Sequence, residues 1–151
     1  MRSLGLDIGD RRIGVALSDP LGIMATPLEV FEHSDDAGDI SHILQLTRHY
    51  GVEIIIVGLP QSMDGSLGIQ AEKVQSFTEK LKVASPVPVG YRDERLTTVE
   101  AKRMMEEAGA KKSPHKKKIQ YDAAAAAVIL QSYLNETRPL EYPPIDEPEQ
   151  D

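Results

Sequence analysis

The sequence predicts a single α/β domain, built on a five-stranded mixed sheet with helices on both faces. Apolar runs near the start of the chain, separated by turn residues, are typical of antiparallel strands. Further along, short apolar runs alternate with segments of helical period, as in parallel crossover units. The length of 151 residues, with 40% hydrophobic and 27% charged residues, fits one ordinary globular domain.

Three antiparallel strands are expected first. Residues 3–8 and 13–18 are rich in Leu, Ile and Val, and the segment 9–12 between them has turn chemistry, so the pair predicts a β-hairpin. Residues 23–31 are expected to form the third strand. Pro27 inside that run favours an edge position or a bulge, because proline cannot donate to a sheet ladder.

The rest of the domain alternates between helices and strands. Apolar residues at helical spacing, with capping signals, predict helices over residues 36–49, 70–82, 97–109 and 119–134. Short apolar runs predict parallel strands over residues 53–58 and 87–91. Five consecutive alanines, 123–127, favour helix formation and allow the last helix to pack close to the sheet.

Charge is distributed unevenly along the chain, whose net charge is −7. Residues 136–151 hold six acids, four prolines and one arginine, which predicts a disordered acidic tail behind a folded domain of residues 1–135. Residues 92–118 carry a positive charge balance instead, with nine Lys or Arg against five Asp or Glu. The lysine-rich segment 111–118 is expected to be a loop, either simply solvated or in contact with phosphates.

The composition also bounds the location of the protein. The absence of cysteine excludes disulfides and thiolate metal sites, and it fits a cytoplasmic protein. No apolar stretch approaches the roughly 18 residues that a membrane span needs, so no membrane association is expected. The oligomeric expectation is a monomer or a weak homodimer.

Acidic residues stand at the predicted ends of separate elements. Asp7 lies near the end of the first strand, Asp93 and Glu94 follow the strand 87–91, and Asp122 lies near the predicted start of the last helix. Ligands in α/β sheets gather at the carboxyl ends of the parallel strands. Carboxylates brought together there repel one another unless a cation lies between them, and hard oxygen ligands favour Mg²⁺ or Mn²⁺. Such ions support hydrolysis of phosphodiester bonds.

Simpler interpretations of these acids remain open. Asp7 would also suit a buried ion pair with Arg11 or Arg12. Asp93 and Glu94 would also suit surface pairs with their arginine neighbours, Arg92 and Arg95. Asp122 would also suit a first-turn acid at a helix N-terminus. The histidines, which have no ligand-like spacing, are expected to be non-catalytic: His33, His42, His49 and His115.

Four blocks of sequence resemble one family. They are Gly5-Leu-Asp-Ile-Gly-Asp-Arg-Arg-Ile-Gly-Val-Ala16, Val57-Gly-Leu-Pro-Gln-Ser-Met-Asp-Gly65, Asp93-Glu-Arg-Leu-Thr-Thr98 and Lys118-Ile-Gln-Tyr-Asp-Ala-Ala-Ala125. In this order they resemble the YqgF family, also called RuvX, of the RNase H-like superfamily of nucleases and Holliday junction resolvases. The resemblance extends from Met1 to about Leu134.

This resemblance implies an RNase H-like fold and a cytoplasmic nuclease that processes the 5′ end of pre-16S rRNA. A resolvase role on branched DNA has also been proposed for relatives. The implied catalytic and metal-binding acids are Asp7, Glu94 and Asp122, with Asp93 as a helper or second metal ligand, and the implied cofactor is Mg²⁺ or Mn²⁺. Residues expected to contact the nucleic-acid backbone are Arg11, Arg12, Arg95, Lys116, Lys117, Lys118 and the loop from Gly58 to Gly65.

Two other functions are alternatives to the nuclease. Asp-Ile-Gly at a hairpin also opens the phosphate-binding loop of actin-like ATPases, but those proteins need two such domains and this chain has room for one. A non-catalytic module that binds RNA or a ribosome-assembly partner would use the same fold. With two Phe, five Tyr and no Trp, base stacking is expected to contribute little to nucleic-acid binding.

Overall fold

A computed structural model describes residues 1–60, 68–94, 103 and 114–137, with side chains in the last range described from Ala123 onward. The elements follow in the order β1 (Ser3–Ile8), β2 (Arg12–Ser18), β3 (Ala25–Glu32), α1 (Asp36–Tyr50), β4 (Ile54–Leu59), α2 (Ile69–Ala84), β5 (Val89–Asp93) and α4 (Pro114–Thr137). None of the described helices is long and apolar enough to cross a membrane.

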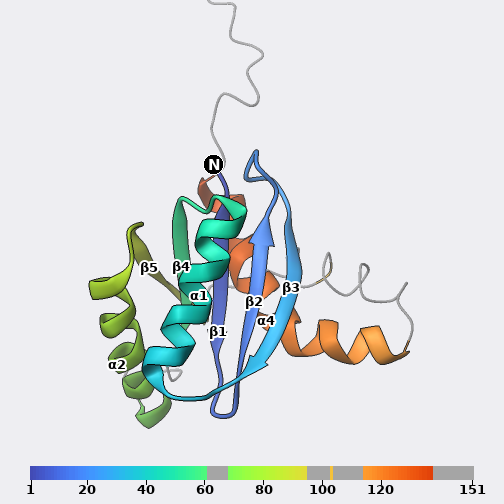
Figure 1. The fold of residues 1–151 in the computed structure, drawn as a ribbon. Coiled ribbons are helices and arrows are strands. Elements are labelled where there is room, and N and C mark those ends of the chain that lie inside the picture. The colour runs from blue at the N-terminus through green and yellow to red at the C-terminus, as the bar shows by residue number, and fades with distance from the viewer. Residues whose placement is uncertain (61–67, 95–102, 104–113, 138–151) are drawn as a thin grey trace, which may run out of the picture.

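The five strands form one mixed sheet in the order β3-β2-β1-β4-β5 (Figure 1). β1 pairs antiparallel with β2, and β2 pairs antiparallel with β3. β1 pairs parallel with β4, and β4 pairs parallel with β5. The predicted mixed sheet is therefore confirmed. Because β1, β4 and β5 are parallel, their carboxyl ends meet at one edge of the sheet, which we call the carboxyl edge.

Both consequences expected of Pro27 are present. β3 is an outer strand of the sheet. The pairing of β2 with β3 also shifts register between Val15 and Ala16, since Val15 lies opposite Glu29 whereas Ala16 lies opposite Pro27. This bulge removes one residue from regular pairing beside the proline, which has no N–H to donate.

One face of the sheet is covered by α1 and α2 (Figure 1). Alternate residues of β1 point to this face, and Leu4 and Leu6 are fully buried there. The helices contribute apolar side chains at helical spacing, among them Ile43 of α1 and Val74 and Leu81 of α2, all 0% exposed. Large aliphatic side chains therefore fill this side of the core.

The opposite face is covered by α4 alone among the described helices (Figure 1). Its core combines small residues, with Ala16 of β2 and Ala126 and Ala127 of α4 fully buried, and larger aliphatic ones, namely Ile56, Ile129, Leu130 and Leu134. A Cβ atom added to Gly5 of β1 would lie 2.8 Å from the Cβ of Leu130 and 3.0 Å from the carbonyl oxygen of Ala126. The expected close packing of the alanine-rich helix is therefore confirmed, and the glycine makes it possible.

Two sequence predictions need correction. Lys116, Lys117 and Lys118 belong to α4, which begins at Pro114, and not to a loop. Proline is tolerated in the first turn of a helix because the N–H that it lacks would have no intrahelical partner there.

The last strand begins at Val89, because the Ser85 side chain forms hydrogen bonds with both the N–H and the carbonyl of Val87 and holds a turn there. The helix expected over residues 97–109 lies outside the described residues except for Arg103.

Candidate active site

Asp7 is the second-last residue of β1, where it pairs with Gly14 of β2. Strand alternation places it on the face that Gly5 presents to α4. Its carboxyl group is largely buried, and this burial raises its pKa. Among the described residues, no ion pair joins Asp7 to Arg11 or Arg12, so the simple ion-pair interpretation of this acid is not supported.

Glu94 directly follows β5 and reaches back over β4. Its Oε2 atom lies 3.1 Å from the position that a Cβ of Gly58 would take. Burial raises the pKa of Glu94, and the negative charges of Asp7 and Asp93 raise it further. Two carboxyl groups from β1 and β5 are therefore close enough to interact across the strand that separates them.

Gly58 makes this approach possible. It lies in β4 opposite Arg92 of β5, so its backbone belongs to the sheet and not to the loop that follows. A Cβ at this position would lie 2.4 Å from the Cδ1 atom of Ile129 of α4, in addition to its contact with Glu94. The glycine therefore leaves room for both. Its expected role as a phosphate ligand stays a prediction, and Gly65 lies outside the described residues.

Asp93 and Glu94 point to different sides of the sheet. Asp93 is the last residue of β5 and shares a strand face with Tyr91, which packs against the α1/α2 core. Arg92 lies on the other face and is almost fully buried. Its guanidinium donates to the Glu136 carboxylate at 2.6 Å and to the Ser132 hydroxyl at 2.9 Å. Arg92 therefore binds α4 rather than the neighbouring acids, which corrects the expected surface pairing.

Asp122 lies well inside α4, whose first turn contains no acidic residue. The interpretation as a first-turn acid is therefore wrong, because the helix begins at Pro114, earlier than the sequence predicted. Asp122 precedes Ala126 by about one helical turn. The carbonyl of Ala126 lies against Gly5, two residues before Asp7 in β1. The side chain of Asp122 itself is outside the described residues.

The expected nucleic-acid contacts are only partly described. Arg11 and Arg12 are exposed at the turn between β1 and β2, next to the carboxyl edge. Lys116, Lys117 and Lys118 are in the first turns of α4, and their side chains are not described. Arg95 lies outside the described residues. The turn thus exposes two arginines at the end of β1, on a segment held by the hydrogen bond from Gly9 N–H to the Arg12 carbonyl at 2.9 Å.

The donor set suits a hard divalent cation. Asp7 and Glu94 offer carboxylate oxygens, the ligands that Mg²⁺ and Mn²⁺ prefer, and burial disfavours both charges in the absence of a counter-ion. Within the described side chains no group of three or more His, Cys, Asp or Glu residues is arranged to hold a metal ion. The third expected acid, Asp122, is not among those side chains.

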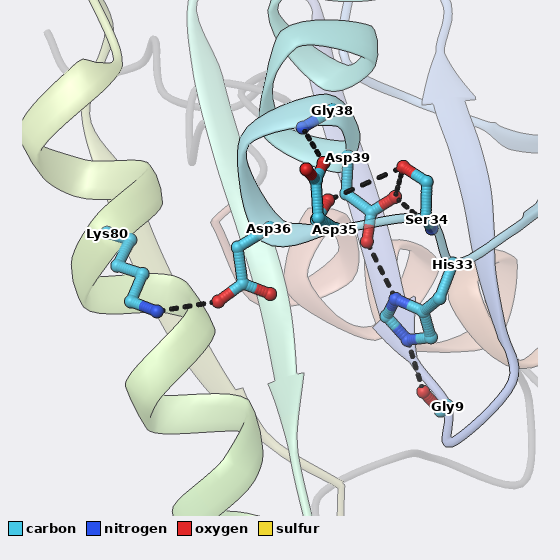
Figure 2. Close-up of polar contacts among 8 residues, drawn as sticks. All are labelled: Gly9, His33, Ser34, Asp35, Asp36, Gly38, Asp39 and Lys80. Atoms are coloured by element: carbon cyan, nitrogen blue, oxygen red, sulfur yellow. Dashed lines mark hydrogen bonds and ion pairs between the residues drawn. The ribbon is translucent and has the colours of Figure 1, made fainter.

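His33 is a residue whose position the sequence did not reveal. Its ring contacts the carbonyl of Gly9 in the first hairpin and the carboxylate of Asp39 in α1 (Figure 2). Spacing offers no signal for this contact, since Gly9 is 24 positions away in the sequence. Arg92 was likewise overlooked as a link to α4, whose residues come 40 and 44 positions later.

Comparison with known proteins identifies the family. The RuvX family, described as "Holliday junction resolvase", matches residues 1–136. A relative from Desulforudis audaxviator is 47% identical over 135 residues, covering 89% of this chain and 94% of the relative. A relative from Halothermothrix orenii is 50% identical over 135 residues, covering 89% of this chain and 95% of the relative. Both carry the name "Putative pre-16S rRNA nuclease".

Solved structures show the same fold. The RuvC structure from Thermus thermophilus aligns with a TM-score of 0.59 at 17% identity, covering 90% of this chain and 96% of that chain. A Fowlpox virus resolvase in complex with Holliday junction DNA aligns with a TM-score of 0.56 at 14% identity, covering 92% of this chain and 100% of that chain. At these identities the likeness concerns the fold. The chain therefore belongs to the RuvX family of nucleases and has an RNase H-like fold.

Proposed function

We propose that this nuclease is a divalent-metal-dependent endonuclease, with Asp7, Glu94 and Asp122 as its catalytic centre. The observation that carries the proposal is the meeting of Asp7 and Glu94. They come from separate strands and lie on the same face, and burial and mutual repulsion raise the pKa of Glu94. Buried like charges cost free energy in a resting protein, so such a pair is typical of a cation-binding or catalytic site.

Asp7, Glu94 and Asp122 would hold Mg²⁺ or Mn²⁺, with Asp93 as a helper whose charge also reaches Glu94. A bound ion would supply water activation and stabilisation of the leaving oxygen in phosphodiester hydrolysis. Asp7 provides a fixed ligand, because its strand is hydrogen-bonded on both sides by β2 and β4. Glu94 follows the end of β5, where strand pairing stops at Asp93.

The remaining residues of the proposed site hold the nucleic acid. Arg11 and Arg12 would bind backbone phosphates beside Asp7, without reading the base sequence. Arg95, the lysines at the start of α4 and the segment from Gly58 to Gly65 would extend this surface. The Gly58–Gly65 segment precedes α2, whose N-terminal N–H groups favour an anion.

The proposed substrate is the 5′ region of pre-16S rRNA, in the cytoplasm. The relatives that support it match 89% of this chain at 47% to 50% identity and are named for pre-16S rRNA, while the choice of the 5′ region rests on the sequence resemblance. Branched DNA is the second candidate, favoured by the description of the RuvX family as a Holliday junction resolvase.

A cleavage assay with matched substrates tests both candidates. A precursor rRNA fragment that spans the mature 5′ end and a four-way DNA junction are incubated separately with the wild-type protein and Mn²⁺ or Mg²⁺. We expect cleavage of the rRNA fragment, lost in Asp7→Asn and in Asp122→Asn by at least about 100-fold, since even supporting contacts of a metal site cost about 10-fold to 100-fold.

Binding measurements on the same variants separate loss of chemistry from loss of fold. Asp7→Asn should bind the rRNA fragment as the wild type does, because the amide is isosteric and one fewer negative charge does not weaken phosphate binding. Cleavage that persists unchanged in Asp7→Asn would refute the proposed centre. Binding without any metal-dependent cleavage by the wild type would favour a non-catalytic module, and preferential cleavage of the junction would replace rRNA with DNA as substrate.

A further inference from the structure

His33 contacts the turn between β1 and β2 from outside the hairpin. The backbone N–H of His33 donates to the carbonyl of Arg11 at 2.9 Å. The His33 ring reaches the carbonyl of Gly9 with Nε2 at 2.7 Å. His33 therefore contacts the turn at two of its carbonyls, and one of them follows Asp7 by only two residues.

Both ring nitrogens of His33 act as donors. Nδ1 lies 2.8 Å from the Oδ2 atom of Asp39, while Nε2 faces the carbonyl of Gly9 (Figure 2). A carbonyl and an ionised carboxylate only accept hydrogen bonds, so each ring nitrogen must carry a proton. The geometry thus selects the imidazolium form of His33.

The Asp39 carboxylate, which accepts from the His33 ring, is itself held by hydrogen bonds. Asp39 is 2% exposed, and its Oδ1 atom accepts hydrogen bonds from the backbone N–H of Ser34 at 2.9 Å and from the Ser34 hydroxyl at 3.1 Å. The N-terminus of α1 is capped by Asp35, which accepts from the Gly38 N–H at 2.8 Å. These contacts, all visible in Figure 2, make the start of α1 a rigid support for the imidazole.

A second contact reaches the same part of β1. The Gln70 side chain of α2 donates to the carbonyl of Ile8 at 3.3 Å. α1 and α2 are in turn joined by the ion pair of Asp36 with Lys80, at 2.7 Å. The end of β1 is therefore tied to both helices on the face opposite α4.

We propose that His33 is a positioning residue for the nuclease reaction: its imidazolium, held by Asp39, fixes the Gly9 carbonyl and thereby the turn that places Arg11 and Arg12 beside Asp7. This inference rests on the proposed catalytic role of Asp7. It assigns to His33 no contact with the substrate or with a metal ion. Its effect passes through the hydrogen bonds to the turn.

The charge of His33 makes the turn sensitive to pH. Burial alone lowers the pKa of His33, but the hydrogen bonds to Asp39 and to the Gly9 carbonyl, with the charges of Asp39 and Asp36, outweigh it and raise the pKa above the ordinary value. Deprotonation at higher pH removes one of the two ring N–H donors. His33 must then lose its hydrogen bond either to the Gly9 carbonyl or to Asp39. Other charged groups around this region are Glu32 of β3, Lys80 of α2, and Asp10, Arg11 and Arg12 of the turn.

Two substitutions separate the two ring contacts. The amide nitrogen of His33→Gln lies near the former Nε2 position, so this variant keeps a donor for the Gly9 carbonyl. The amide of His33→Asn corresponds to Nδ1 and cannot reach Gly9. We expect kcat/KM for the rRNA fragment to fall about 10-fold to 100-fold in His33→Asn, as for other supporting residues of a site, and much less in His33→Gln. His42→Asn, which removes another histidine–carboxylate contact away from the turn, is the control.

A readout independent of cleavage is the pH dependence of backbone amide NMR shifts in the turn. In the wild type, the Gly9 and Arg12 amides should titrate together with the His33 ring, and in His33→Gln this titration should vanish. Asp7→Asn should abolish cleavage yet leave the titration intact, so failure of the catalytic proposal and failure of this inference give different results. Equal activity of His33→Asn and wild type, or turn amides that ignore the His33 titration, would overturn the inference.

Discussion

The two faces of the sheet are packed in different ways. On the α1/α2 face, large side chains such as Leu4, Leu6 and Leu81 are fully buried. On the α4 face, Gly5, Ala16 and Ala126 provide little side-chain volume and bring backbone close to backbone. Both faces bury apolar side chains, among them Ile129 and Leu130 on the α4 face, but only the α4 face also sets a short distance between a helix and the strands that carry acids. Packing on that side of the sheet therefore serves both stability and the geometry of the proposed site.

Substitutions on the α1/α2 face should therefore act mainly on stability, and Leu6→Ala gives the largest expected effect. Leu6 is fully buried in β1, so the loss of its side chain should lower the free energy of unfolding by about 2–5 kcal/mol. Urea unfolding followed by circular dichroism measures this change. Leu21→Ala, at a position that is 75% exposed, is the control and should change stability little. Similar losses in both variants would contradict the asymmetry between buried and exposed positions.

A substitution on the α4 face should instead couple stability to activity. In Gly5→Ala the new methyl group would lie within 3.0 Å of α4 atoms, so the helix must move away from β1. We expect a loss of about 1–3 kcal/mol in the free energy of unfolding, as for overpacked cores, together with reduced cleavage at temperatures where the variant is folded. Thermal unfolding and single-turnover cleavage are measured on the same samples.

Gly90→Ala is the matched control for that experiment. It makes the same change in β5, where the new methyl group would meet only the Cδ1 atom of Ile56, at 3.9 Å. It should leave both stability and cleavage close to wild type. If Gly5→Ala lowers stability but leaves cleavage per folded molecule intact, the short helix-to-strand distance is not needed for the site.

The smallest expected effect is electrostatic and concerns His33 on the α1 side. Because the pKa of His33 is raised in the folded protein, its ion pair with Asp39 contributes stability that is fully present below the unfolded histidine pKa of about 6.5. This contribution is lost as the pH rises through the higher folded value. The difference in urea midpoint between wild type and His33→Gln should therefore shrink from pH 5.5 to pH 8.5. A difference in urea midpoint that grows over this pH range would contradict the raised pKa of His33.

Much of the fold could be predicted because hydrophobic periodicity, which defines strands and helices, is a property of the local sequence. The strand Ser3–Ile8 has the predicted bounds, and the strand order agrees with the expected meander followed by parallel crossovers. Asp7 and Glu94 were identified because parallel strands bring their carboxyl ends to the same edge of a sheet. This argument needs only the order of elements, which hydrophobic periodicity provides.

The errors have two sources: a local signal that also fits another structure, and partners that lie far away in the sequence. Pro114 was interpreted as part of a loop, although proline at a helix start is favourable and α4 continues through the lysines. The alternative in which Arg92 pairs with the acids next to it in sequence is wrong, because α4 supplies Ser132 and Glu136 as its partners. His33 has no distinguishing local pattern, because its partners belong to the hairpin and to α1. The disordered tail and the roles of Asp122, Arg95 and Gly65 stay predictions.

The contact of Gly5 with Ala126 and Leu130 also has a consequence for biosynthesis. A residue near the start of the chain there meets residues near the end of the described part, while β1, β2 and β3 pair with near neighbours in sequence. As the chain leaves the ribosome, the antiparallel strands can form early, but the α4 face stays open until α4 has emerged. A nascent chain can therefore form the meander well before α4 completes the opposite face of the sheet.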